Sequence, residues 1–313
     1  MCNNIHMGEK YEISFIVPSF NEEENIKLLF DRINEVFKNT PYNVIYIDDG
    51  SKDNTFSEIK KLAENHKNVK AVSFSRNFGK EAAIYAGLNR ADGKYICLID
   101  ADMQQDPIVS LDMINILKKD EDIDCVCAVP RKRKDNPIMI CVKNAFYNVI
   151  NAMCDITFEK NASDFRTFRS CVKDALISLK EYERFSKGLF SWVGFNTTYI
   201  EYDVKPRASG KSKWSFAKLL KYALNGIISF SIKPLMLPLF FGVLLLITSL
   251  AFVVIKIYNP SFLSAMDGNA FIIVVLLFVG LFFISFGILG LYLSKIYMQN
   301  KNRKIYVVKD EIK

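Results

Sequence analysis

The amino-acid sequence predicts an α/β domain with a Rossmann-like, mostly parallel sheet, followed by an interfacial segment and two transmembrane helices. Three observations lead to this fold class. Short apolar runs alternate with amphipathic stretches, two long uncharged runs occupy the last part of the chain, and polar side chains gather where the short runs end. The chain has 313 residues and a formal net charge of +7. This length suffices for one large domain with an attachment.

Four short apolar runs have the pattern of strands: ISFIVPSF, NVIYIDDG, VKAVSFS and KYICLID. Helical patterns follow the first three runs, from about residue 22, from about residue 53 and over 80–90. Such alternation predicts parallel strands covered by helices. Ligands of open parallel sheets bind beyond the carboxyl ends of the strands, so the candidate site comprises PSFNEEEN, DDGSKDNT, SRNFGKEA and DADMQQDP.

Two uncharged apolar runs predict transmembrane helices at 234–258 and 269–296. Residues 234–255 and 269–294 contain no charged side chain, and each run reaches the ~20 residues that span the hydrocarbon core. The connector NPSFLSAMDGN holds one Asp and no Lys or Arg, whereas both outer flanks are basic. This asymmetry predicts a multi-pass protein of the cell membrane with its soluble domain and both termini in the cytoplasm.

The remaining segments complete the predicted division of the chain. The soluble domain covers 1–213, an amphipathic segment at 214–233 lies in the membrane interface, and 297–313 forms a basic cytoplasmic tail. The seven cysteines show no CxxC spacing, and several fall inside apolar runs. We therefore expect reduced, buried thiols.

The composition excludes several functions. Only His6 and His66 are present, which excludes a three-His zinc site and a Ser/His/Asp hydrolase. No GxGxxG follows the first strand, and the GKS at 210–212 lacks the Gly that a P-loop needs five residues earlier, where Lys205 stands. The basic residues gather near the predicted spans without an aromatic platform, so we expect no nucleic-acid partner. Catalysis would then depend on carboxylates, Lys and Arg.

Asp100, Asp102 and Gln104 emerge from the apolar strand KYICLID. Polar side chains are costly there unless they bind something, and Mg²⁺ or Mn²⁺ prefers such oxygen ligands together with water and phosphate oxygens. The pattern predicts a metal diphosphate as ligand, with a solvated turn as the alternative. Asp48 and Asp49 close another strand at a Gly-Ser turn, where they either form the turn or accept a hydrogen bond from a nucleobase.

Seven motifs occur in the order seen in family 2 glycosyltransferases: VPSFNEEENI, IDDGSKDNT, SRNFGKEAAIYAG, DADMQQDP, SDFRTF, RFSKGLFSWVGF and RASGKSKW. The set resembles the polyprenyl-phosphate branch, which includes bacterial undecaprenyl-phosphate glucosyltransferases and dolichyl-phosphate mannose synthases. The resemblance covers nearly the whole chain. It implies a GT-A nucleotide-sugar-binding fold and an inverting, metal-dependent transfer of one hexose, with glucose favoured, from a UDP-sugar to undecaprenyl phosphate. The product would be a lipid-linked sugar for cell-surface glycan modification.

The resemblance also implies roles for individual residues. The implied catalytic residues are Asp164, Asp102 and Arg166, of which Asp164 acts as a base or orients the acceptor phosphate. Asp102 and Gln104 bind Mg²⁺ or Mn²⁺. Gln105 competes with Gln104 for this role because QQDP carries one Gln more than the commoner motif. The nucleotide sugar binds to Pro18, Phe20, Glu22, Ile47, Asp49, Asp100 and Ala101. For the acceptor phosphate and the diphosphate, the candidate cations are Arg131, Arg133, Arg207 and Lys213.

Several alternatives stay open. The donor sugar can be N-acetylglucosamine, galactose or mannose from GDP-mannose, and the chain can be an inactive membrane scaffold that partners a flippase. Processive polysaccharide synthesis is disfavoured because no QxxRW motif occurs. A homo-oligomer assembled through the membrane helices is also considered, although Gly287 and Gly290 do not form a GxxxG motif.

Overall fold

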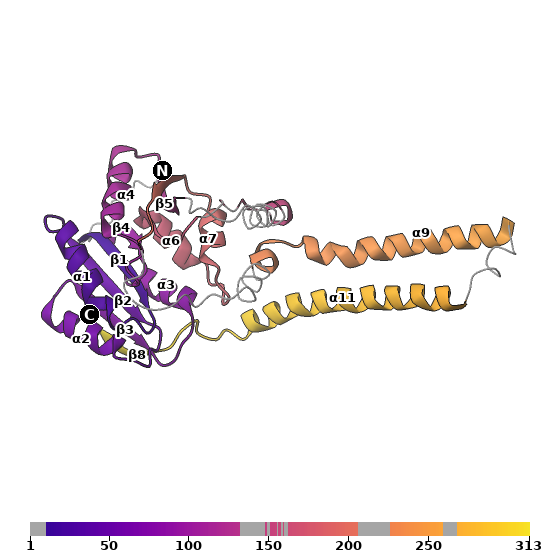
Figure 1. The fold of residues 1–313 in the computed structure, drawn as a ribbon, viewed down its shortest axis with the longest axis horizontal. Coiled ribbons are helices and arrows are strands. Elements are labelled where there is room, and N and C mark those ends of the chain that lie inside the picture. The colour runs from indigo at the N-terminus through magenta and orange to yellow at the C-terminus, as the bar shows by residue number, and fades with distance from the viewer. Residues whose placement is uncertain are drawn as a thin grey trace.

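The computed structural model describes residues 11–131, 148, 151–154, 156–157, 159, 162–205, 226–258 and 268–313. A layered α/β domain carries two long helices that project from it side by side (Figure 1). This arrangement confirms the predicted fold class. The predicted interfacial segment at 214–233 lies outside the described residues up to position 225.

The sheet has eight strands in the order β7-β5-β6-β4-β1-β2-β3-β8. Strands β4, β1, β2 and β3 are parallel neighbours, as the alternation predicts, and β5 pairs in parallel with β7. Strand β6 is antiparallel to both β4 and β5, and β8 is antiparallel to β3. The strands are β1 (Tyr11–Ser19), β2 (Tyr42–Asp48), β3 (Val69–Phe74), β4 (Gly93–Leu98), β5 (Cys125–Pro130), β6 (Arg166–Arg169), β7 (Thr197–Tyr202) and β8 (Val308–Ile312).

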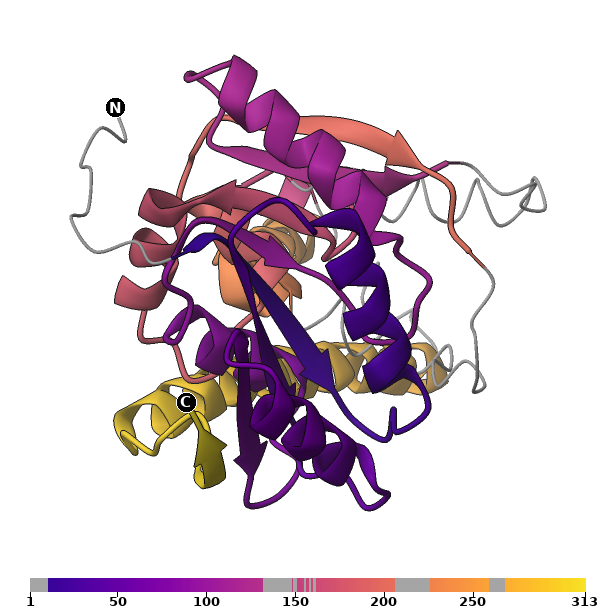
Figure 2. The ribbon, with the colours of Figure 1, turned by 90° about the vertical axis from the view of Figure 1, so that its left-hand side faces the viewer.

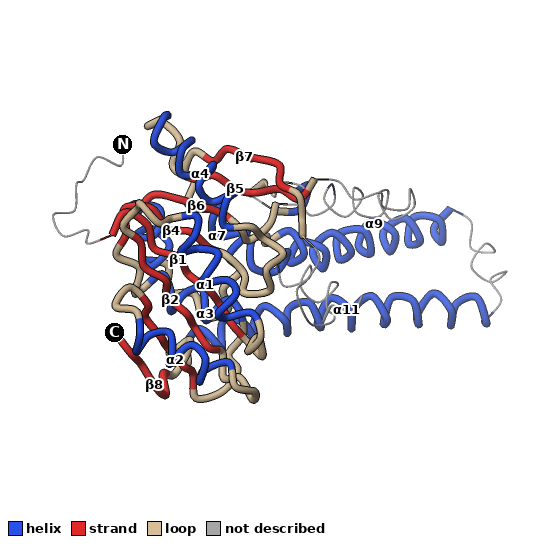
Figure 3. Tube along the Cα trace, turned by 60° about the vertical axis from the view of Figure 1, so that its left-hand side comes forward, coloured by secondary structure: helices blue, strands red, loops and turns tan. Residues whose placement is uncertain are grey.

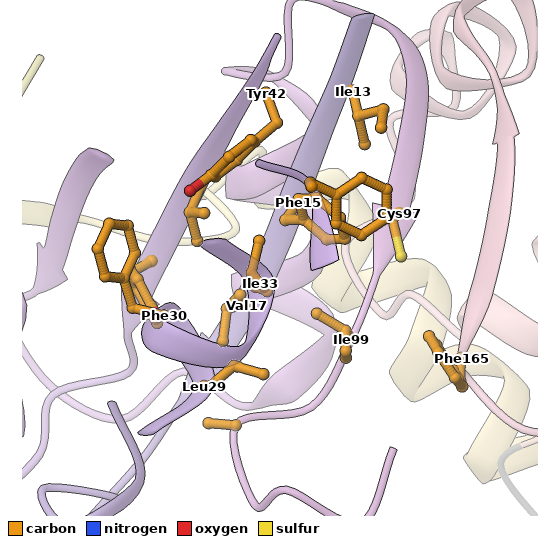
Figure 4. Close-up of a cluster of buried hydrophobic side chains, with 14 of the residues drawn as sticks. Ile13, Phe15, Val17, Leu29, Phe30, Ile33, Tyr42, Cys97, Ile99 and Phe165 are labelled. Carbon is orange, nitrogen blue, oxygen red and sulfur yellow. The ribbon is translucent and has the colours of Figure 1, made fainter. Parts of the chain in front are cut away.

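Helices cover both faces of the sheet (Figure 3). They are α1 (Asn25–Val36), α2 (Thr55–Asn65), α3 (Lys80–Leu88), α4 (Pro107–Lys119), α6 (Ser170–Ser178) and α7 (Ser186–Trp192). Because side chains alternate along a strand, Phe15 of β1 faces the core under α1, α2 and α4, whereas Ile16 faces the core under α3, α6 and α7. Figure 4 shows Phe15 and Val17 of β1 beside Leu29 and Ile33 of α1 in the first core.

Two apolar helices extend from one side of the α/β domain (Figures 1 and 3). The short 3-10 helix η1 (Lys233–Met236) leads into α9 (Leu237–Tyr258), and α11 (Gly268–Asn300) returns toward the domain. Lys233–Tyr258 and Val275–Asn300 are long and apolar enough to span a membrane, with mean hydropathies of 2.6 and 2.5 and no buried share. These two candidate spans overlap the two that the sequence predicts, at 234–258 and 269–296.

The end of the chain differs from the predicted tail. After α11 the chain returns to the sheet, where β8 pairs with the edge strand β3 (Figure 2). Tyr306 stacks on Phe74 with ring centroids 4.9 Å apart, and Arg90 Nε lies 3.0 Å from Glu311 Oε1. Strand β8 pairs with the edge strand β3 and so satisfies backbone groups that β3 would otherwise expose, while Tyr306 and Val308 pack on the core beside it. The last residues therefore belong to the α/β domain.

The cysteine prediction holds in part. Cys97, Cys125, Cys127 and Cys154 are free and buried, as expected. Cys171, near the start of α6, is disulfide-bonded, so the expectation of a reduced thiol is wrong at this position.

Candidate active site

The candidate site lies where β1, β2 and β4 end. Pro18 and Ile47 are register partners on neighbouring strands, so the ends of β1 and β2 lie together. The loops that follow are joined, because the Asn21 amide donates to Ser51 Oγ at 2.9 Å and the Glu22 amide donates to Thr55 Oγ1 at 2.8 Å. The structure thus gathers at one edge of the sheet the predicted nucleotide-binding residues Pro18, Phe20, Glu22, Ile47, Asp49, Asp100 and Ala101.

Asp49 fastens a neighbouring loop to this edge. Its carboxylate accepts hydrogen bonds from the amides of Phe78 at 2.6 Å and Gly79 at 2.9 Å. Gly50 is required at the same contact, because its φ is 67° and an added Cβ would lie 2.5 Å from the Arg76 carbonyl carbon. Burial raises the pKa of Asp49 to about 6. The structure therefore supports turn and loop formation by Asp49, while the nucleobase contact stays a prediction.

Lys80 joins two carboxylates from distant parts of the chain. It is the first residue of α3, and its Nζ lies 2.7 Å from Asp100 Oδ1 and 2.9 Å from Asp164 Oδ2. Asp100 follows β4, and Asp164 precedes β6, which pairs with β4. The antiparallel insertion of β6 thus places the predicted catalytic carboxylate beside the DAD motif. Sequence reasoning assigned Lys80 no role, although SRNFGKEA marks it at the end of a strand.

The charges around Asp164 keep it ionised. Burial alone would raise the pKa of Asp164, but the nearby cations Lys80, Lys187 and Arg166 hold it well below its usual range. Burial would likewise lower the pKa of Lys80, but Asp100 and Asp164 raise it. A carboxylate with a lowered pKa is a weak proton acceptor, so this arrangement favours electrostatic positioning by Asp164 over general-base catalysis.

The DADMQQDP loop separates the roles of its two glutamines. Gln105 is buried, with 6% of its surface exposed; its Oε1 accepts from the Asp100 amide at 2.9 Å and its Nε2 donates to Asp100 Oδ2 at 3.2 Å. The backbone amide of Gln104 donates a hydrogen bond to Asp102 Oδ1 at 3.2 Å, and Met103 between the two residues has a φ of 61°. A non-glycine residue in the left-handed region is uncommon and often marks a functional turn. Gln104 therefore stays beside Asp102, whereas Gln105 supports Asp100.

These oxygen donors fit a magnesium or manganese ion that is bound mainly through substrate. Among the described residues, no group of three or more His, Cys, Asp or Glu side chains could hold a metal ion. Mg²⁺ typically takes one or two carboxylates and fills its remaining positions with water and substrate phosphates. Asp102 with the neighbouring amide oxygen of Gln104 suits this partial set, and the metal assignment stays a prediction.

Arg166 lies behind Asp164 in the protein interior. Only 5% of its surface is exposed, its Nη2 donates to the Ser163 carbonyl at 2.8 Å, and its guanidinium carbon lies 4.1 Å from the Phe190 ring centroid. Its Nε is buried and has no hydrogen-bond partner. Arg166 thus contributes positive charge to Asp164 from within the fold, and its predicted catalytic role is untested.

The predicted acceptor-binding cations are only partly described. Arg131 follows β5 and forms exposed ion pairs with Glu201 at 3.4 Å and Asp203 at 3.1 Å. The other three lie outside the described residues: Arg133, Arg207 and Lys213. The described chain before RASGKSKW ends at Lys205, whose amide donates to the Gln104 carbonyl at 3.1 Å. The basic motif therefore begins two residues beyond a contact with the DADMQQDP loop.

Helix α7 connects the site to the segment before the first apolar helix. Its first residue, Ser186, donates through its amide to Glu81 Oε2 at 2.9 Å and through its hydroxyl to the same oxygen. Burial raises the pKa of Glu81 to about 7. On the other side, an added Cβ at Gly188 would lie 2.2 Å from the Phe230 ring, so α7 packs closely on this segment. Glu81 and Lys187 were not predicted, although both lie within the quoted motifs.

Comparison with known proteins defines the class. Residues 14–171 match the family described as Glycosyl transferase family 2. The bactoprenol glucosyl transferase of Shigella phage SfV is 37% identical over 307 residues, covering 96% of this chain and 99% of the relative. An uncharacterized glycosyltransferase of Synechocystis is 37% identical over 306 residues, covering 96% and 95%. The chain therefore belongs to glycosyltransferase family 2 and is a glycosyltransferase.

A solved structure shows the same fold. Glucosyl-3-phosphoglycerate synthase from Mycobacterium tuberculosis, in complex with Mn²⁺, uridine diphosphate and phosphoglyceric acid, aligns with a TM-score of 0.51 at 20% sequence identity. The alignment covers 70% of this chain and 76% of the synthase. The α/β domain thus has the GT-A fold that the motifs imply.

Proposed function

We propose that this enzyme transfers one glucose, with inversion, from UDP-glucose to undecaprenyl phosphate at the cytoplasmic face of the membrane. The observation that carries the proposal is the contact of Lys80 with both Asp100 and Asp164, at the sheet edge of a domain attached to two candidate spans. The bactoprenol glucosyl transferase relatives support glucose as the sugar and a polyprenyl phosphate as the carrier. The product would supply cell-surface glycan modification.

The acceptor needs orientation more than activation. A phosphate monoester has a second pKa near ~6, so its oxygen is mostly ionised at neutral pH and is already a nucleophile. In the proposed step this oxygen attacks the anomeric carbon from the face opposite the nucleotide, the bond from that carbon to the diphosphate oxygen breaks, and UDP leaves. Asp164, ionised through its neighbouring cations, orients the acceptor phosphate through those cations and stabilises positive charge on the sugar carbon.

Cations must keep the negative groups together. Lys80 already balances Asp100 and Asp164, which otherwise would repel a phosphate. Arg131 is proposed to bind the acceptor phosphate with Arg133, Arg207 and Lys213. Its present pairs with Glu201 and Asp203 are exposed, and such pairs are worth ~0–1 kcal/mol, so exchanging them for a phosphate costs little.

Asp102 and Gln104 are proposed to hold Mg²⁺ or Mn²⁺. When bound, the ion supplies positive charge that stabilises the leaving diphosphate. The structural neighbour with Mn²⁺ and uridine diphosphate supports a divalent ion for this fold. Gln105 and Lys80 keep Asp100 in place next to that position, where it would contact the ribose or a bound water.

The cytoplasmic location rests on charge and topology. The basic flanks lie at the ends of the helix pair that meet the α/β domain, and β8 returns the chain to the same sheet that β1 begins. We therefore place the soluble domain and both termini in the cytoplasm. A homo-oligomer and a flippase partner stay predictions.

The test uses full-length protein in detergent with undecaprenyl phosphate, Mg²⁺ or Mn²⁺, and a panel of labelled UDP- and GDP-sugars, followed by lipid extraction. We expect label in the lipid phase from UDP-glucose, and its loss with EDTA. Label from another sugar would replace glucose in the proposal. No label from any donor, with folding verified by circular dichroism, would contradict the proposed transfer.

A further inference from the structure

A cavity lies at the opposite end of α3 from the candidate active site. It has a volume of about 630 Å³ and is bounded by the end of α3, the loop between α6 and α7, the end of α11 and the strap of residues 301–307 that leads to β8. Helix α3 has nine residues, so Lys80 at its start is separated from its last residue by about 12 Å at 1.5 Å per residue. The cavity is therefore distinct from the Lys80 site.

The lining of this cavity is cationic. Four of its residues are Lys or Arg, and none of the described lining residues is Asp or Glu. Arg90 is matched by Glu311 at 3.0 Å, but Lys180, Arg303 and Lys304 form no ion pair with any residue in the described ranges. Three side chains that carry positive charge thus line one cavity, and no carboxylate of the described residues forms an ion pair with them.

Hydrogen bonds join the segments that line this cavity. Gln299, in the last turn of α11, accepts a hydrogen bond from the Tyr182 amide at 2.8 Å and donates to the Lys180 carbonyl at 3.0 Å. On the strap, Tyr306 accepts a hydrogen bond from Arg90 Nη1 at 3.2 Å and stacks on Phe74. These contacts join the loop between α6 and α7 to the end of α11, and the strap to Arg90 and to β3.

We propose that this cavity binds a phosphate-bearing anion. Its volume falls within the ~300–1,000 Å³ of small-molecule sites, and unmatched Lys and Arg side chains are the groups that bind phosphate oxygens. Basic residues that directly follow a transmembrane helix commonly contact anionic lipid headgroups, and Arg303 and Lys304 follow the candidate span that ends at Asn300. A phospholipid headgroup and free phosphate share this chemistry.

The experiment compares the full-length protein with the variant Lys180→Ala/Arg303→Ala/Lys304→Ala. The probes are phosphatidylglycerol and phosphatidylcholine in mixed detergent micelles, read as bound lipids by native mass spectrometry, and inorganic phosphate, read as a shift in Tm. A matched control removes three exposed cations elsewhere on the domain, Lys27→Ala/Lys38→Ala/Lys67→Ala.

We expect the unsubstituted protein and the control to retain phosphatidylglycerol over phosphatidylcholine, and the cavity variant to bind it at least about tenfold more weakly. Binding of inorganic phosphate without preference for phosphatidylglycerol would support the site and assign it to a soluble anion. Equal binding of both probes by the cavity variant, equal losses in the control, or no binding of either probe would overturn the proposal. Because no sugar donor is present, none of these results depends on the proposed transfer reaction.

Discussion

The two ends of helix α3 differ in how their positive charges are balanced. At the first residue, Lys80 lies between the carboxylates of Asp100 and Asp164. Beyond the last turn, Lys180 and Arg303 line a cavity whose described residues include no Asp or Glu. A cation that is already paired keeps reactive carboxylates in position, whereas unpaired cations can hold only a ligand that brings negative charge. The start of α3 thus contributes to the candidate active site, and its end contributes to a cavity suited to binding an anion.

The largest expected effect is at the proposed metal position. Asp102→Ala should reduce transfer by at least about 10³-fold, because a metal ion contributes several kcal/mol to stabilising the diphosphate. Initial rates of lipid labelling measure this effect. The matched control, Asp112→Ala on the exposed face of α4, should keep the rate of the unsubstituted protein. Full activity of folded Asp102→Ala would remove Asp102 from the metal site.

The paired end of α3 is tested next by Lys80→Ala, for which we expect a loss of about 10²-fold in kcat. Without Lys80, only Lys187 and Arg166 oppose the effect of burial, so the pKa of Asp164 should rise and activity should fall more steeply at acid pH than in the unsubstituted protein. The measurement is kcat/KM between pH 5 and pH 8. Lys80→Arg keeps the charge and should restore the acid side of the profile that the unsubstituted protein shows, in which only the acceptor phosphate titrates. An unchanged profile in Lys80→Ala would show that Lys80 does not hold Asp164 ionised.

Loss of the contact between β8 and Arg90, which follows α3, should have a moderate effect. Glu311→Ala removes the ion pair with Arg90, so β8 should detach more often and the C-terminal segment should be cleaved about fivefold faster, as expected for the loss of about 1 kcal/mol. Limited proteolysis with mass detection measures the rate. Lys309→Ala, an exposed neighbour on the same strand, serves as the control. Equal cleavage rates in the two variants would mean that Arg90 does not anchor β8.

The smallest effect concerns Glu81, which joins α3 to α7. Because burial raises the pKa of Glu81 from its usual 4.5 to about 7, the folded state binds more protons than the unfolded state in this interval. Stability from this group is therefore complete below pH 4.5 and is lost as the pH rises through 7. Glu81→Gln does not titrate, so its Tm relative to the unsubstituted protein should rise by a few degrees between pH 5 and pH 8. A constant difference would contradict the raised pKa.

Short-range sequence patterns predicted the strands and helices that follow one another directly along the chain. The alternation of apolar and amphipathic segments predicted the parallel strands β1 to β4 and the helices between them, and the two uncharged runs predicted both candidate spans. The antiparallel strand β8 was missed because its apolar residues lie within a basic tail, and it is recognisable only through its pairing with β3.

In the candidate site, too, contacts between residues far apart in the sequence could not be predicted. Strand ends predicted Asp100 and Asp102, but the contact of Lys80 with Asp164 joins residues 84 positions apart and depends on how β6 pairs with β4. Nothing in a single sequence shows that pairing. The competition between Gln104 and Gln105 likewise needed three-dimensional structure, because only Gln105 turns inward to Asp100.

The most direct test of the account is the initial rate of glucose transfer from UDP-glucose to undecaprenyl phosphate in an uncharged detergent. The rate is measured side by side for three proteins. The unsubstituted protein and Lys180→Ala/Arg303→Ala/Lys304→Ala should transfer glucose at similar rates, and Lys80→Ala should be slower by about 10²-fold. Equal rates for the unsubstituted protein and Lys80→Ala would contradict the assignment of the reaction to this end of α3. No transfer by any of the three folded proteins would contradict the proposed reaction itself.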